Sequence, residues 1–284
     1  MTFAGIPEEF ARIQTSRIVV QPVPFDGTST WGKGADKGPA AILEAAENME
    51  LYDIETGTEV YRQGIFLSAP VDEARSPEAM SEAVYRATSV FLRDDKFVMT
   101  LGGEHSISIG AIRAHAESFP DVTVLQIDAH SDLRDSYHGS KHNHACVMAR
   151  AKEVAKIVQV GIRAMDIGEL DNMDRDRVLF AHEIHRDANW IEKVLRLLTG
   201  NVYITIDLDA FDPAFVPATG TPEPGGLTWM QVIDLLEAVN AHSTIVGADV
   251  VELAANPNHR GSDFLAAKLV YRLLSMVFAK RALA

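Results

Sequence analysis

The chain contains 284 residues, 47% of them hydrophobic, which is enough for one large α/β domain, and we expect residues 1–284 to form a single domain. Its formal net charge of -14 argues against nucleic acid or an anionic membrane as a partner, because those partners require clustered Lys and Arg. No apolar run reaches the ~18 residues that a membrane-spanning helix needs.

In chain order, short apolar runs alternate with longer stretches of helical period, which is typical of βα units. The runs predict strands over residues 17–25, 64–70, 96–102, 122–128, 156–162, 177–184, 201–209 and 244–253. The stretches between them predict helices over residues 39–49, 76–94, 106–119, 189–200, 227–239 and 262–279. Because the strands are apolar on both faces, we expect an α/β fold in which helices cover a parallel sheet on each side.

Two further features predict a cytoplasmic protein. The single cysteine, Cys146, cannot form a disulfide within the chain, as is usual in a reducing compartment. The N-terminal stretch MTFAGIPEEFARIQ is acidic and interrupted, whereas a secretory signal is basic and then apolar.

Histidine and carboxylate side chains follow four of the predicted strands, at the point where each strand ends. In LQIDAHSD, residues at alternating positions point to the same side of an extended backbone, so three side chains can converge. Sites in open α/β sheets form at the carboxyl ends of strands, and these four strands supply His105, Asp128, His130, Asp132, Asp207, Asp209 and Glu252. One such pair alone is usually a turn or a cap. Four neighbouring aspartates repel one another unless cations are present, so together they predict a metal site.

The ligand types indicate which metal the site takes. Four aspartates and two imidazoles suit Mn²⁺, with Fe²⁺, Ni²⁺, Co²⁺ or Zn²⁺ as alternatives. Six ligands are enough for two ions if two of the carboxylates each bind both ions. Two ions ~3.5 Å apart lower the pKa of a shared water and generate hydroxide, so the predicted reaction is a hydrolysis.

Six motifs, in order along the chain, resemble those of the ureohydrolase family of arginases and agmatinases: GGEHS, DAHSDLRD, HACVMAR, TIDLDAFDPAF, ATGTPEPGGLTW and DVVELAANP. The similarity runs from about residue 20 to the C-terminus and is greatest to the shorter agmatinases. It implies a three-layer α/β/α fold around a mostly parallel sheet of about eight strands. It also implies two Mn²⁺ ions per chain, a small cationic guanidino substrate, and assembly into homotrimers or homohexamers.

The resemblance also implies a role for each site residue. His105 and Asp132 would bind one ion, His130 and Asp209 the other, with Asp128 and Asp207 as bridges. Glu252 would bind the substrate guanidinium, a planar cation that pairs well with a carboxylate. His144, selected by HACVMAR, would be the general acid for the leaving amine, a role that suits an imidazole titrating near neutrality. His138 and His142 are expected to be loop residues.

The predicted activity is hydrolysis of agmatine to putrescine and urea by attack of a metal hydroxide. The resemblance of HACVMAR and of the ELAANPNHRGSDFLAAKL ending to agmatinases favours agmatine, and an acidic cavity mouth would accept its ammonium. Arginase, guanidinobutyrase or formimidoylglutamase-like activity and a non-catalytic metal-stabilised scaffold are the alternatives. Asp166 could bind the substrate's amine, although a buried ion pair between Arg163 and Asp166 is the preferred interpretation.

Overall fold

A computed structural model describes residues 2–283 and contains one sheet of eight strands, all of them parallel to their neighbours. The strands are β1 (Ile18–Val23), β2 (Ile65–Leu67), β3 (Phe97–Gly102), β4 (Thr123–Ile127), β5 (Lys156–Ile162), β6 (Val178–Phe180), β7 (Asn201–Asp207) and β8 (Thr244–Val251). Their order across the sheet is β2-β1-β3-β8-β7-β4-β5-β6. Each lies within one of the eight ranges predicted from the sequence.

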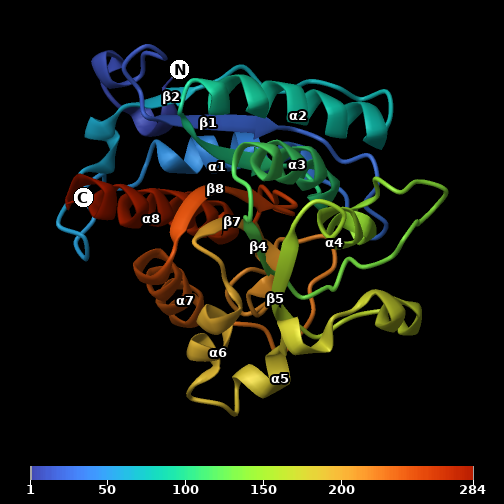
Figure 1. Ribbon diagram of the computed structural model, residues 1–284. Helices are drawn as coiled ribbons and strands as arrows, with labels where there is room; N and C mark the ends of the chain where they lie inside the picture. The colour runs from blue at the N-terminus through green and yellow to red at the C-terminus, as the bar shows by residue number, and fades with distance from the viewer. Residues whose placement is uncertain (1, 284) are drawn as a thin grey trace.

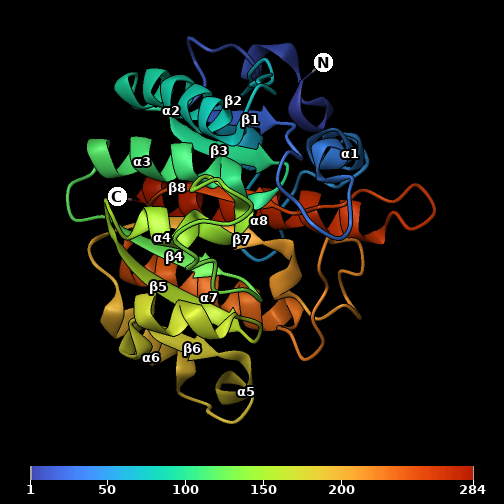
Figure 2. The same ribbon diagram turned by 90° about the vertical axis from the view of Figure 1, so that its right-hand side faces the viewer.

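Helices cover both faces of this sheet, as Figures 1 and 2 show. The helices are α1 (Gly38–Ala46), α2 (Pro77–Arg93), α3 (Ser108–Ser118), α4 (Val147–Ala151), α5 (Ala181–Ile184), α6 (Trp190–Leu197), α7 (Trp229–His242) and α8 (Gly261–Leu283). Helices α1, α6, α7 and α8 share one apolar core with the sheet, whereas α2, α3 and α4 share a second core on the other face. The predicted three-layer α/β/α architecture with a parallel sheet is confirmed. Among residues 2–283, no helix is both long enough and apolar enough to cross a membrane.

The sequence prediction is wrong at the end of β6. Residues 181–184 were expected to continue the strand, but they form the short helix α5. Ala181 and Ile184 are buried three residues apart, the spacing of one helix face, and the Glu183 carboxylate accepts a hydrogen bond from the Phe180 N–H at the helix start. The helix α4 was not predicted at all, since five residues are too few to show a period.

The strand order decides where the candidate residues meet. β3, β8, β7 and β4 are adjacent in the centre of the sheet, and each of them is followed by residues of the candidate set. Because all the strands are parallel, their carboxyl ends lie at the same edge. The topology therefore collects side chains from positions 105 to 252 at one place.

A buried histidine on α3 predicts how stability depends on pH. His115 is 1% exposed, its Nδ1–H donates to the carbonyl of Ala111 (2.8 Å), and its ring packs against Tyr203 of β7. Burial lowers the pKa of His115 to about 4. The unfolded chain therefore binds the additional proton between about pH 6.5 and pH 4, and the free energy of unfolding should fall by about 3 kcal/mol as the pH drops through that window.

We expect His115→Gln to show less of this loss, because glutamine can still donate to Ala111 and does not titrate. Urea unfolding of both proteins in EDTA at pH 7.5 and pH 4.5 measures the difference. Equal pH dependence in the two proteins would show that His115 contributes nothing to it.

Candidate metal centre

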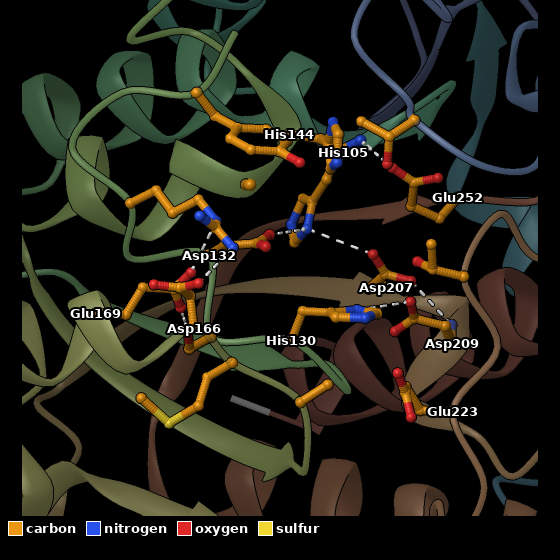
Figure 3. Close-up of a pocket in the computed structure, with 18 residues that line it drawn as sticks. His105, His130, Asp132, His144, Asp166, Glu169, Asp207, Asp209, Glu223 and Glu252 are labelled. Carbon is orange, nitrogen blue, oxygen red and sulfur yellow. Dashed lines mark hydrogen bonds and ion pairs between the residues drawn. The ribbon is translucent and has the colours of Figure 1, made fainter.

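The carboxyl ends of the central strands surround a cavity of about 270 Å³ (Figure 3). Seven of the eight residues predicted for the site line it: His105, His130, Asp132, His144, Asp207, Asp209 and Glu252. Asp128, the eighth, is completely buried beneath them. The structure therefore brings together all the residues that the sequence analysis selected.

The first group of candidate ligands surrounds His105, which follows β3. Its Nδ1 atom lies 3.0 Å from a carboxylate oxygen of Asp132, 3.2 Å from one of Asp128 and 3.4 Å from one of Asp207. This Nδ1 is buried and makes no hydrogen bond within residues 2–283. An imidazole nitrogen directed at three carboxylates and left without a hydrogen bond is suited to binding a cation with them.

The second group surrounds His130. Its Nδ1 atom lies 2.9 Å from a carboxylate oxygen of Asp209 and 3.7 Å from one of Asp128. Ligand atoms of His130, Asp128 and Asp209 all lie within 4.8 Å of one another, as do those of His105, Asp128 and Asp132. Asp128 is the member that the two groups share.

The electrostatics of these groups favour a bound cation. Burial raises the pKa of Asp207 well above its ordinary value, and the neighbouring carboxylates of Asp209 and Asp128 raise it further. Burial lowers the pKa of His130, but Asp209 and Asp128 outweigh that effect and raise it to about 12. Without metal, the cluster thus holds protons to offset repulsion between its carboxylates. Oxygen-rich donors with two imidazole nitrogens fit hard or borderline divalent ions.

Unusual backbone conformations direct two of these side chains. Asp132 has φ = 52° and Glu252 has φ = 66°, in the left-handed region that residues other than glycine rarely adopt. Glu252 comes directly after β8, and its N–H donates to the carbonyl of Gly103 (2.8 Å). Its carboxylate accepts a hydrogen bond from the N–H of His105 (2.8 Å) and lines the cavity. The chain thus turns at the end of β8 so that Glu252 faces the cavity beside His105.

The segment that contains His144 is tied to the loop after β4. The N–H groups of Met148 and Ala149, in the first turn of α4, donate to the carbonyl of Asp132 (3.0 and 3.2 Å). His144, four residues before Met148, lines the cavity, whereas His138 and His142 do not. The expectation of a ring titrating near neutrality is wrong for this structure: burial, with the nearby His105 and His130, lowers the pKa of His144 to about 4.

Sequence analysis missed a buried chain of hydrogen bonds behind His105. The His105 Nε2–H donates to the hydroxyl of Thr205 (2.9 Å), which donates to the carboxylate of Asp249 (2.6 Å). Tyr203 also donates to Asp249 (2.6 Å). Such partners hold a ligand ring in one orientation, leaving Nδ1 toward the cavity. An acid in the middle of an otherwise apolar strand, as at position 249, is the sequence signal for them.

The predicted ion pair between Arg163 and Asp166 does not form. An Nη atom of Arg163 donates to the backbone carbonyls of Asp209 (2.7 Å) and Glu223 (2.8 Å). Asp166 instead pairs with Arg134 at 3.4 Å and accepts a hydrogen bond from the Gly168 N–H. Arg163 faces the loops after β7, where several carbonyls need donors, and its guanidinium can satisfy more than one of them.

Comparison with known proteins decides the family. The family model described as "Arginase family" matches residues 16–275. The chain belongs to the arginase family. It is a ureohydrolase close to the agmatinase-type enzymes, as the six motifs predict.

The relatives of this arginase-family chain match it over nearly its whole length. It is 40% identical to the N(1)-aminopropylagmatine ureohydrolase of Synechocystis sp., covering 96% of this chain and 94% of that protein. It is 30% identical to the agmatinase of Pyrococcus horikoshii, covering 93% of each. The crystal structure of the agmatine ureohydrolase of Thermoplasma volcanium superposes with a TM-score of 0.89 at 33% identity, covering 99% of this chain and 97% of that one.

Proposed function

We propose that this ureohydrolase removes urea from a linear guanidino amine, either agmatine or agmatine extended by an aminopropyl group. The observation that carries the proposal is the cavity in which two candidate ligand groups lie beside the buried carboxylate of Glu252. We rank the extended substrate first, because the relative named for it is 40% identical whereas the agmatinase of P. horikoshii is 30% identical. Agmatine, the substrate predicted from the sequence, is the second candidate.

In this proposal the ligands divide as the family pattern implies. His105 and Asp132 would bind one Mn²⁺ and His130 and Asp209 would bind the other, and Asp128 and Asp207 would serve both. The contacts of His105 and His130 with these carboxylates support the division. When bound, the two ions supply a water activated for attack at neutral pH and neutralise the carboxylates.

Glu252 holds the guanidinium of the substrate. Burial, and then the neighbouring Glu104, raise the pKa of Glu252 well above its ordinary value. A guanidinium brought to this carboxylate restores its ionised form and pairs with it through charge-assisted hydrogen bonds, which are stronger than those between neutral groups. Glu252 thereby positions the guanidinium carbon for attack.

His144 moves the proton that the leaving group requires. Because burial lowers its pKa, the ring is neutral near pH 7 and offers a nitrogen lone pair to the cavity. The ring takes a proton at that nitrogen as water attacks, and gives it to the amine nitrogen as the C–N bond breaks. A low pKa makes the protonated ring a strong acid and so favours the second transfer.

The far end of the substrate needs a counter-charge, and Glu223 is the carboxylate best suited to supply it. Asp166 and Glu169 also line the cavity, but both already pair with Arg134. The Glu223 carboxylate lines the cavity and makes no hydrogen bond or ion pair within residues 2–283. Its backbone is fixed, since it lies between Pro222 and Pro224 and its carbonyl accepts from Arg163.

We expect Glu223→Gln to lower kcat/KM for agmatine roughly tenfold, because it removes a charge opposite the substrate's ammonium. For butylguanidine, which has no second charge, the effect should be less than about twofold. Parallel urea assays measure both values. A similar loss for both compounds would mean that Glu223 supports the cavity and does not bind the tail.

A side-by-side urea assay with Mn²⁺ tests the proposed function itself. N(1)-aminopropylagmatine and agmatine should be cleaved with higher kcat/KM than arginine or guanidinobutyrate. A higher kcat/KM for either acid would overturn the substrate class, and no urea from any of the four would favour the scaffold alternative. The homotrimer or homohexamer and the cytoplasmic location stay predictions, and light scattering after gel filtration measures the first.

A further inference from the structure

We propose that Thr28 is a positioning residue for His144, which holds the ring through its Nδ1 atom so that protons enter and leave at Nε2. The inference rests on the role of His144 in the proposed function. Thr28 lies 116 positions before His144 in the chain, in the loop after β1, and none of the sequence motifs points to it.

Two hydrogen bonds join these residues. The Thr28 hydroxyl oxygen accepts from the backbone N–H of His144 at 2.9 Å and lies 3.0 Å from the Nδ1 atom of the same ring. One hydroxyl thus contacts the main chain and the side chain of the same histidine. That arrangement restrains both the position of the residue and the rotation of its ring.

A count of contacts shows which ring nitrogen is left for the reaction. A threonine hydroxyl can accept two hydrogen bonds and donate one. The backbone N–H of His144 occupies one lone pair of the Thr28 hydroxyl, and the same hydroxyl is within hydrogen-bond distance of Nδ1. Nδ1 is thus engaged with Thr28 in either tautomer of the ring, and Nε2 is the nitrogen left for proton transfer.

The loop around Thr28 is built to hold it in place. The carboxylate of Asp26 accepts hydrogen bonds from the Ser29 hydroxyl, from the Gly34 N–H (2.8 Å) and from the Lys33 ammonium (3.1 Å). The N–H of Glu104 donates to the carbonyl of Phe25 (2.8 Å), which ties the start of this loop to the segment before His105. These bonds hold the loop that carries Thr28 against the segment before His105 without help from a substrate.

This arrangement leaves Nε2 available for the reaction. The ring lines the cavity, and its Nε2 makes no hydrogen bond within residues 2–283. When Nε2–H gives its proton to the amine nitrogen, the Nε2–H bond breaks, an N–H bond forms on the leaving amine, and the ring returns to its neutral form. The bond to Thr28 is kept throughout, so the ring does not need to turn between the two transfers.

Two substitutions at this position test the inference. Thr28→Val keeps the shape and removes the hydroxyl, whereas Thr28→Ser keeps the hydroxyl. We expect Thr28→Val to lower kcat roughly 10- to 100-fold, the usual effect of losing a group that orients a reacting ring, with KM and metal content unchanged within about twofold. Thr28→Ser should retain kcat within about threefold. An unchanged kcat in Thr28→Val, or an equal loss in both variants, would overturn the inference.

Crystal structures of the two variants give a readout that does not depend on turnover. The His144 ring should keep its place in Thr28→Ser and should rotate or occupy two positions in Thr28→Val. A ring that is unmoved in Thr28→Val would also overturn the inference. Failure of the proposed function is distinguishable, because in that case the unaltered protein with Mn²⁺ releases no urea from any guanidino compound.

Discussion

Replacing Asp128 by alanine should leave the protein without its metal pair and lower urea release by roughly a thousandfold or more. Asp128 is the residue common to both candidate ligand groups and is completely buried between them. Its two carboxylate oxygens lie 3.2 Å from Nδ1 of His105 and 3.7 Å from Nδ1 of His130. Removing it takes a ligand from each ion and leaves room for water in place of a negative charge.

Metal analysis by mass spectrometry and thermal unfolding with and without Mn²⁺ measure this effect. The unaltered protein should bind two ions and gain stability from them, because a ligand that binds only the folded state raises its melting temperature. The Asp128→Ala variant should gain little thermal stability from Mn²⁺. Asp135→Ala is the matched control, since that aspartate follows in the same segment but is exposed and pairs with Arg150 and Lys141. Retention of two ions by Asp128→Ala would contradict a shared ligand.

Replacing His144 by asparagine should lower kcat by ~10²–10⁴-fold, the usual contribution of a general acid or base. The metal content should stay near that of the unaltered protein. His144 lines the cavity, but it belongs to neither of the candidate ligand groups. Asparagine also retains the backbone N–H that donates to Thr28, so the local fold should survive.

His142→Asn is the matched control, because His142 lies two residues earlier, does not line the cavity and faces Glu78 at 4.0 Å. Its kcat should stay within about twofold of the parent value. Steady-state kinetics and metal analysis of both variants decide the point. If His144→Asn loses metal, the histidine is a ligand; if His142→Asn loses activity instead, the proton-transfer role belongs to that residue.

The architecture was predictable because its signals are local and repeated. Each strand is an apolar run bounded by polar residues, and a run that is apolar on both faces has few stable environments besides a covered parallel sheet. The wrong prediction at the end of β6 also comes from relying on a local pattern. RVLFAHEI has only eight residues, so a short strand followed by one helical turn cannot be told from a longer strand by its pattern.

The candidate site was predictable for a related reason. Its residues follow directly after strands, as with Asp128 after β4 and Glu252 after β8, so their approximate place depends only on the sheet being parallel. Their mutual repulsion predicts a cation without any knowledge of distances. The selection of His144 over His138 and His142 depended on the resemblance to a family, because all three lie in one irregular segment.

By itself, the sequence determined the α/β class, the strands that form the sheet and the set of acids and histidines at its edge, since periodicity and strand ends are properties of neighbouring residues. Only the tertiary structure decided the partners of those residues. Thr28 meets His144 across 116 positions, Thr205 and Asp249 meet behind His105, and Arg163 binds carbonyls after β7 instead of Asp166. Hydrogen bonds depend on distances of about 3 Å between atoms far apart in the chain, and such distances are set by how helices and loops pack, which no local pattern encodes.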